Sequence, residues 1–268
     1  MKVIREICTA GNVIDVTVKV PSGRHNGKRN PKVNLTLEKV QKNNDRLATK
    51  KLSRIINANF DKNSWHDTLT YKNAPSVEEA KKELKKFINR VTYTMQKRGL
   101  EHKWVVATEY QGKRIHHHFI TNAPLDIVRD KWTSGHMLPR PFDDQKNYYK
   151  LAEYIIKETA KTFRLSSSPF GSRYSHSRNL VMPEIRVEEV DESKLWDDPK
   201  PLKGYYIDQD TVRRYEHPIT GLEHLEYMMI SISEEPRIKK YYRGKKKKHD
   251  ERYLRFIETE EQESLFEI

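Results

Sequence analysis

The segment Ile115-His-His-His-Phe-Ile120 is the most informative part of this chain. It has the composition of a β-strand, and so does the preceding run Lys103–Glu109. Between them, Gln111–Arg114 contains a glycine and polar residues typical of a turn. Either a two-residue turn or a four-residue loop gives the same strand register. The sequence therefore predicts a β-hairpin over 103–122.

Side-chain alternation gathers metal-binding groups on one face of this hairpin. His116 and His118 are two residues apart and point the same way, whereas His117 points to the other face. The register places Glu109 opposite His116, at roughly 5 Å between Cβ atoms. Two imidazoles and a carboxylate can bind a divalent, catalytic metal. A polar strand that faces solvent or DNA explains the histidines equally well, so a second chemical element is needed.

The composition points to a polyanionic partner. The 268 residues include 51 Lys and Arg against 38 Asp and Glu, a net charge of +13. This excess favours nucleic acid first and an anionic membrane surface second. With no apolar run of membrane-spanning length, no signal-peptide pattern and only one cysteine, we expect a cytoplasmic protein that does not contact membranes. There is no P-loop motif, so we expect no ATPase motor in this chain.

The remaining elements indicate an α+β fold. Their order of strand, long helix, hairpin and helix predicts a central antiparallel sheet of about five strands with helices packed on one face. Ser76 and Glu79 form a capping box that begins the long helix, and Gly99 ends it. The predicted elements are a hairpin over 3–20, a basic helix within 34–59, a strand over 65–71, a helix over 76–99 and a helix over 147–161.

Beyond residue 180 the pattern changes to a β-rich extension and then a tail. Strands are predicted over 184–190, 205–208 and 225–233. Residues 237–255 contain ten Lys and Arg, and 258–268 contain five Glu, which indicates either a solvated tail or a flexible nucleic-acid arm masked by its acidic end. The predicted organisation is an N-terminal hairpin and basic helix over 1–57, a catalytic domain over 58–185, a β-rich extension over 186–235 and a flexible tail over 236–268.

A possible nucleophile lies on the helix predicted over 147–161. Tyr154 and Lys157 are three residues apart and share a helix face. A protonated tyrosine is a poor nucleophile, and a nearby lysine favours the phenolate or neutralises a phosphate in the transition state. Such pairs are common on amphipathic helices. The pair gains weight because it follows the histidine strand by about forty residues.

Together these residues resemble the rolling-circle replication initiators of the HUH endonuclease superfamily, which bacterial plasmids, phages and integrative elements encode. Asp67-Thr-Leu-Thr-Tyr71 resembles the family's first motif, Glu109 with His116-x-His118 the metal motif, and Tyr154-x-x-Lys157 the nucleophile motif. The match covers roughly residues 55–185. One departure is His117, which stands where the family usually has a bulky apolar residue. Alternation predicts that it packs or hydrogen-bonds away from the metal, whereas a bulged strand would let it replace a neighbouring ligand.

The resemblance implies a metal-dependent endonuclease and strand transferase. Tyr154 would cleave one strand of single-stranded or hairpin origin DNA, form a 5′-phosphotyrosine link and release a 3′-OH that primes synthesis. Glu109, His116 and His118 would bind Mn²⁺ or Mg²⁺, and a host helicase and polymerase would act as partners. Position 150, one helical turn before Tyr154, is a lysine, which favours a single-tyrosine enzyme.

Four further residues are expected to contact the nucleic acid: His66, Thr70, Arg173 and Arg178. The arginines suit phosphate geometry, although each could be a solvated loop charge, and His66 could be an ordinary polar strand residue.

Three other functions compete with the replication initiator. One is a conjugative relaxase or transposase with the same chemistry. The others are a non-catalytic DNA-binding regulator on this fold and, as a weaker alternative, an RNA-binding protein.

Overall fold

The computed structural model describes residues 2–21, 38–110, 114–142, 146–163, 172–217 and 221–233, with the side chains of 161–163 left aside. The basic and acidic tail predicted over 236–268 lies outside these residues. Among the helices of the described ranges, none is long and apolar enough to cross a membrane.

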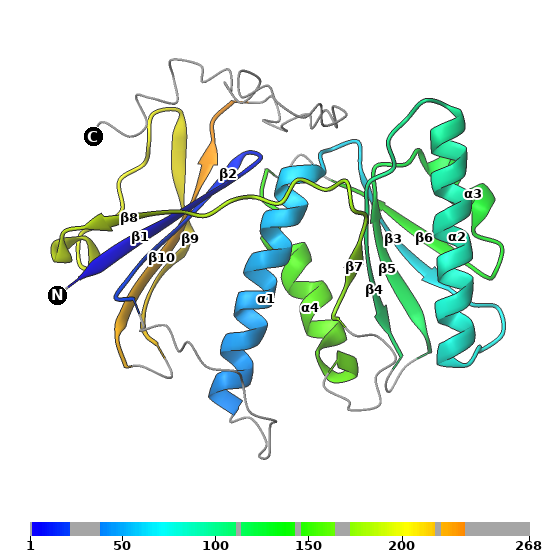
Figure 1. Ribbon diagram of the computed structural model, residues 1–268, viewed down its shortest axis with the longest axis horizontal. Helices are drawn as coiled ribbons and strands as arrows, with labels where there is room; N and C mark the ends of the chain where they lie inside the picture. Colours follow the sequence, from blue (N-terminus) through cyan, green and yellow to red (C-terminus); the bar gives the residue numbers. More distant parts are fainter. Residues whose placement is uncertain are drawn as a thin grey trace, which may run out of the picture.

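The described part of the chain forms two five-stranded antiparallel sheets, four α-helices and one short 3-10 helix over Glu192–Leu195 (Figure 1). In the first sheet the strand order is β8 (Arg186–Val190), β1 (Val3–Ala10), β2 (Val13–Lys19), β10 (Glu223–Ser231) and β9 (Tyr205–Glu216). In the second sheet it is β6 (Met137–Pro141), β3 (Trp65–Thr70), β5 (His116–Thr121), β4 (Trp104–Glu109) and β7 (Ser175–His176).

The helices make the structure layered. α1 (Glu38–Asn59) and α4 (Tyr149–Phe163) lie between the two sheets, and α2 (Val77–Lys97) and α3 (Leu125–Lys131) lie beyond the second sheet (Figure 1). The α+β class with an antiparallel sheet of five strands is confirmed, as are the N-terminal hairpin, the basic helix and the β-rich C-terminal strands.

Helices cover both faces of the second sheet, so the prediction of helices on one face is wrong. On one face Leu69 and Phe119 pack with Phe87 of α2. On the other, Val105 and Ile120 pack in a cluster that contains residues of α1 and α4. Because strand side chains alternate, these sets necessarily point in opposite directions.

Two elements near the site were not predicted. One is the short helix α3. The other is β6, which lies where the sequence indicated a loop around Pro139 and Pro141. β6 is an edge strand, where a proline that lacks a backbone donor is tolerated. The turn before β6 lies against the end of β3, and a Cβ at Gly135 would be only 2.1 Å from the Thr70 carbonyl oxygen. This close approach requires glycine.

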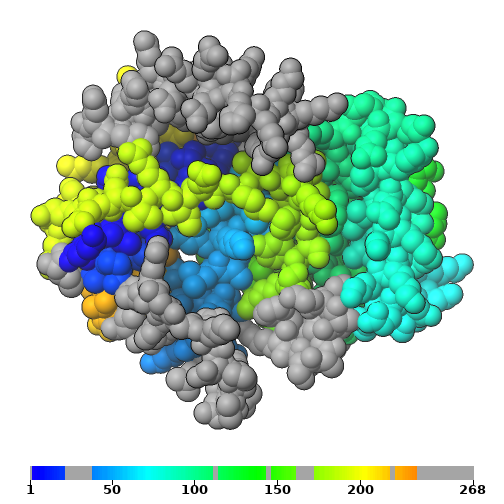
Figure 2. Space-filling view, in the orientation of Figure 1, coloured from blue at the N-terminus to red at the C-terminus, as the bar shows by residue number. Residues whose placement is uncertain are grey.

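The segment between β7 and β8 ties the layers together. Asn59, the last residue of α1, donates from Nδ2 to the Val181 carbonyl (2.8 Å) and accepts from the Val181 amide (2.8 Å). Figure 2 shows this segment as a yellow-green band that crosses over α1.

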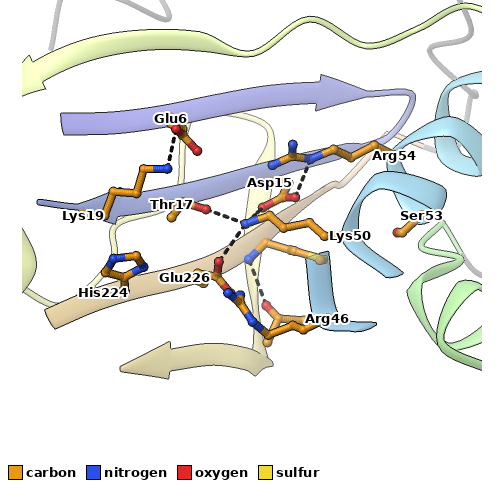
Figure 3. A network of polar contacts seen from close by, with 12 residues as sticks. Glu6, Asp15, Thr17, Lys19, Arg46, Lys50, Ser53, Arg54, His224 and Glu226 are labelled. Atoms are coloured by element: carbon orange, nitrogen blue, oxygen red, sulfur yellow. Dashed lines mark hydrogen bonds and ion pairs between the residues drawn. The ribbon is translucent and has the colours of Figure 1, made fainter. Parts of the chain in front are cut away.

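A buried network of charges joins α1 to the first sheet (Figure 3). Lys50 Nζ lies 3.0 Å from Asp15 on β2 and 3.1 Å from Glu226 on β10. Arg54 pairs with the same Asp15 at 2.8 Å, and Arg46 pairs with Glu226. Burial alone would raise the pKa of Glu226, but the charges of Lys50 and Arg46 outweigh it and lower the pKa to about 2. Arg46, Lys50 and Arg54 are four residues apart, so they form one stripe of the helix.

Replacing Asp15 with Asn should destabilise the protein strongly, because two buried cations lose their shared carboxylate. Breaking a buried pair from one side costs about 3–5 kcal/mol. Urea unfolding followed by circular dichroism measures this loss. The matched control is Glu38→Gln, which removes an exposed ion pair with Lys42 and should leave the unfolding midpoint unchanged. Equal midpoints for Asp15→Asn and the wild type would contradict the prediction.

Asp67 is fully buried on the α2 side of β3. Neither of its carboxylate oxygens has a hydrogen-bond partner among the described residues. Burial raises its pKa to about 7. The folded state therefore keeps the carboxyl protonated up to near-neutral pH, whereas the unfolded chain ionises near pH 4. The free energy of unfolding should consequently fall as the pH rises between these two values.

Asp67→Asn should remove this pH dependence. Relative to wild type, the variant should gain stability between pH 4 and pH 8, by at most about 4 kcal/mol for a shift of about three units. Urea unfolding of both proteins across that range gives the difference at each pH. Subtraction cancels the titration of groups that the two proteins share, including the buried histidines. Parallel pH profiles would contradict the assignment.

Candidate metal centre and nucleophile

The register of the second sheet arranges the candidate ligands in rows across one face. Glu109 of β4 pairs with His116 of β5, and His116 pairs on its other side with Thr70 of β3. In the next row of this face, His118 lies between Ala107 and Thr68. The predicted hairpin register is therefore present.

Glu109, His116 and His118 come close enough to bind one cation. Each offers a ligand atom, and these atoms all lie within 4.8 Å of one another. Oxygen ligands of hard divalent cations lie about 2.0–2.6 Å from the ion, so two opposed ligands are about 4–5 Å apart. The three residues thus form a candidate metal site.

The hydrogen bonds of the two histidines fit a cation at this position. His116 Nδ1 donates to the Arg114 carbonyl oxygen at 2.9 Å, so in the neutral ring Nε2 carries the lone pair. That nitrogen lies 3.2 Å from Glu109 Oε2, another lone-pair atom. A proton or a metal ion between them relieves their repulsion. His118 Nε2 is buried with no hydrogen-bond partner among the described residues, so it too is available as a ligand.

His66 lies directly behind His118. Its Nε2 is 3.3 Å from His118 Nδ1, and the two ring centroids are 5.5 Å apart. Burial, with a smaller contribution from Arg140, lowers the pKa of His66 to about 4. Burial and the neighbouring histidines lower the pKa of His118 to about 3, against the opposing charge of Glu158. Both rings are therefore neutral near pH 7. If His118 Nδ1 donates to His66, its Nε2 keeps the lone pair that a metal requires.

Tyr154 lies beside the candidate metal site. Its ring centroid is 5.3 Å from that of His118 and 6.3 Å from that of His66, with an edge-to-face orientation in both cases. The side chain is 41% exposed, so it is open to a substrate. Helix α4 sets this position because Ile155 and Ile156 are buried on its other side. Lys157 is exposed and lies about 60° round the helix from Tyr154.

His117 packs on the opposite face and is not among the candidate ligands. Its Nε2 is 2.7 Å from the Tyr71 hydroxyl, and its Nδ1 is 2.9 Å from Thr108 Oγ1. Its ring also lies beside that of Trp132. The geometry agrees with the alternation of a regular strand, without the bulge that would have exchanged ligands.

The residues predicted to contact nucleic acid lie at different places. His66 is only 5% exposed, and Thr70 is half-buried opposite His116. Arg173 is ion-paired with Asp45 of α1. Arg178 is exposed just after β7, at the edge of the sheet farthest from β6. The structure brings His66 and Thr70 to the candidate centre and leaves the two arginines away from β3.

Two charged residues near the centre were not singled out from the sequence. Glu158 follows Tyr154 by one helical turn, and its charge acts on His118. Its i+4 spacing was a usable signal. Arg140 pairs with His66 across β3 and β6, but its place depends on a strand that the prolines concealed.

Residues 64–163 match the model of a family described as replication-associated protein ORF2. The matched segment is a little over a third of the chain and runs from just before β3 to the end of α4. It contains the three candidate ligands, Tyr154 and Lys157. The match supports a role in replication. No curated protein and no solved structure matches the chain.

The contact between His66 and His118 predicts how His66 variants should bind metal. His66→Phe keeps a ring but removes the acceptor for His118 Nδ1, and should weaken Mn²⁺ binding about 10–100-fold, the range typical of second-shell partners. His66→Gln offers a carbonyl oxygen and should retain more of the affinity. Isothermal titration calorimetry measures both, with thermal unfolding as a check of folding. Equal Mn²⁺ affinity in His66→Phe and wild type would exclude this role.

Proposed function

We propose that this protein initiates rolling-circle replication by cutting one strand of single-stranded or hairpin origin DNA. The proposed nucleophile is Tyr154, and the proposed metal ligands are Glu109, His116 and His118. The observation that supports this best is the position of the Tyr154 ring beside His118, on the open side of the candidate metal site. The match to a replication-associated family over these residues gives independent support for the replication role.

The proposed reaction is a transesterification. The phenolic oxygen of Tyr154 attacks the scissile phosphorus, and the bond between phosphorus and the 3′ oxygen breaks. The 5′ phosphate becomes linked to the tyrosine, the 3′ oxygen leaves as a hydroxyl, and the phenolic proton is released. One phosphodiester replaces another, so no nucleotide cofactor is required. The free 3′-OH then primes synthesis by a host polymerase, with unwinding by a host helicase.

A bound Mn²⁺ or Mg²⁺ would polarise the scissile phosphate and neutralise charge in the transition state. The protein's own residues position the other groups. α4 presents Tyr154 at an exposed angle, and Lys157 lies at the solvent side of the same helix, where it can approach a phosphate. In this proposal residues 58–185 are the catalytic unit, and 1–57 and 186–235 pack beside it.

A single tyrosine fits the surroundings of α4. Tyr148 is packed against Phe142, with ring centroids 4.4 Å apart. Tyr149 lines a cavity of about 440 Å³ between α4 and the first sheet. Neither makes a ring contact with His118 among the described residues. Tyr154 is therefore the tyrosine of this helix that the proposal assigns to cleavage.

The test is a denaturing-gel assay for a covalent protein–DNA adduct. Single-stranded DNA from the element's own candidate origins is incubated with Mn²⁺ or with EDTA. Wild type should form an adduct with Mn²⁺ only. Tyr154→Phe should form none, since it removes the attacking oxygen. His118→Ala should lose at least about 100-fold in rate if the ion supplies several kcal/mol of stabilisation.

Tyr149→Phe is the matched control, because it alters a tyrosine of the same helix that lies away from the metal site. It should keep full adduct formation. Adduct formation by Tyr154→Phe and its loss in Tyr149→Phe would show that the nucleophile is assigned wrongly. Tight DNA binding without any adduct, across several origins and metals, would favour a DNA-binding regulator instead.

A further inference from the structure

The sheet face that carries the candidate metal site is only partly covered. Val105 and Ala107 of β4 and Ile120 of β5 pack in the cluster formed with α1 and α4. On the same face of β6, by contrast, Leu138 is 55% exposed and Arg140 is exposed. The helices therefore leave a strip of sheet open beside the centre.

The register places this strip precisely enough to relate it to the metal site. Leu138 pairs with Thr68, which pairs with His118. Arg140 pairs with His66. Directly paired residues share a face, so Leu138 and Arg140 point to the side of the sheet that carries His118. Neighbouring strands are about 4.8 Å apart, which puts the β6 backbone about 10 Å from that of β5.

Positive charge lies at both ends of the strip. Arg140 is at one end, and its charge acts on His66, as the lowered pKa of that buried ring reflects. At the other end Arg114 reaches from the start of β5 to the end of β3, where its guanidinium donates to the Lys72 carbonyl at 2.6 Å. Both arginines are exposed. Between them, Leu138 presents an apolar side chain to solvent.

We propose that the β3–β6 strip, made of Thr68, Thr70, Leu138 and Arg140, binds the DNA single strand that leads to the scissile phosphate. Arg140 binds a backbone phosphate, because a guanidinium matches phosphate geometry. Leu138 packs against an unpaired base, a surface that duplex DNA does not offer. Arg114 accepts the backbone at the far end. This inference rests on the proposed function and adds the path of the substrate.

Single-stranded DNA fits the strip better than a protein segment does. The cations at its ends complement a phosphate backbone, and the chain as a whole carries a net charge of +13. Alternation of apolar and cationic side chains is also how single-strand binding surfaces combine base contact with charge. The strip lies next to Tyr154, whose ring contacts that of His66, the residue paired with Arg140.

The test measures binding without cleavage. A fluorescein-labelled oligothymidylate of about 20 nucleotides is titrated in EDTA by fluorescence anisotropy, with every protein in the full-length Tyr154→Phe background. Arg140→Gln should raise Kd about tenfold or more, in keeping with loss of a hydrogen bond to a charged group. The slope of log K against log salt should become shallower by about 0.7, which corresponds to one phosphate contact on a single strand. Leu138→Ser should raise Kd severalfold with an unchanged slope.

The matched controls lie on the other side of the second sheet. Arg129→Gln alters an exposed arginine of α3, and Leu100→Ser alters an exposed leucine after α2. Both should bind as the background protein does. All variants alter exposed side chains, and thermal unfolding checks that they fold.

The outcomes separate this inference from the proposed function. If Arg140→Gln and Leu138→Ser bound with unchanged Kd and salt slope, the strip would be overturned as a DNA surface and left for a protein partner. Adduct formation by the wild type would still support the nuclease. If the wild type formed no adduct while Arg140→Gln lost binding as expected, the strip would stand and the nuclease proposal would fail.

Discussion

The register of β3, β5 and β4 is the constraint on which the candidate site depends. A slip of one residue would turn His116 and His118 to the other face and bring His117 to this one. The buried imidazole of His117 opposes that slip. It contacts the Tyr71 hydroxyl, just after β3, on one nitrogen and Thr108 of β4 on the other. A shifted strand would leave this fully buried ring without partners, at a cost of about 1–3 kcal/mol for each lost group. The central histidine therefore stabilises the arrangement of its two neighbours.

The position of Tyr154 depends on a longer chain of packing. α4 packs through Ile155 and Ile156 in a cluster that includes Leu52 of α1. α1 presents its other side, the stripe of cations, to Asp15 and Glu226 of the first sheet (Figure 3). The first sheet thus positions α1, and α1 supports the helix that carries the tyrosine. The strands that the sequence indicated as peripheral contribute in this way to the geometry of the centre.

Local signals in the sequence predicted the parts of the site that depend on short-range geometry. The hairpin register follows from its turn, and the start of α2 from its capping box. The stripe on α1 was harder to interpret, because Lys50 is buried only by virtue of partners on β2 and β10, far away in sequence. Helices on both faces of the second sheet could have been inferred from β4, where all residues but the first are buried. Such continuous burial is expected of strands covered on two sides. The edge strand β6 was concealed by Pro139 and Pro141, and Arg140 was overlooked with it.

The distribution of charge suggests why metal and DNA binding should be coupled. Although the chain is strongly basic, the centre contains the carboxylates of Glu109 and Glu158 beside two rings, His66 and His118, that burial keeps neutral. The cations nearest to it that the structure describes, Arg140, Arg114 and Lys157, are exposed around it. A phosphate that approaches along the strip is attracted by these arginines but meets negative charge at the centre. A divalent cation on Glu109 reverses that local charge. Metal should therefore increase the affinity for DNA and, by linkage, DNA should increase the affinity for metal by the same factor.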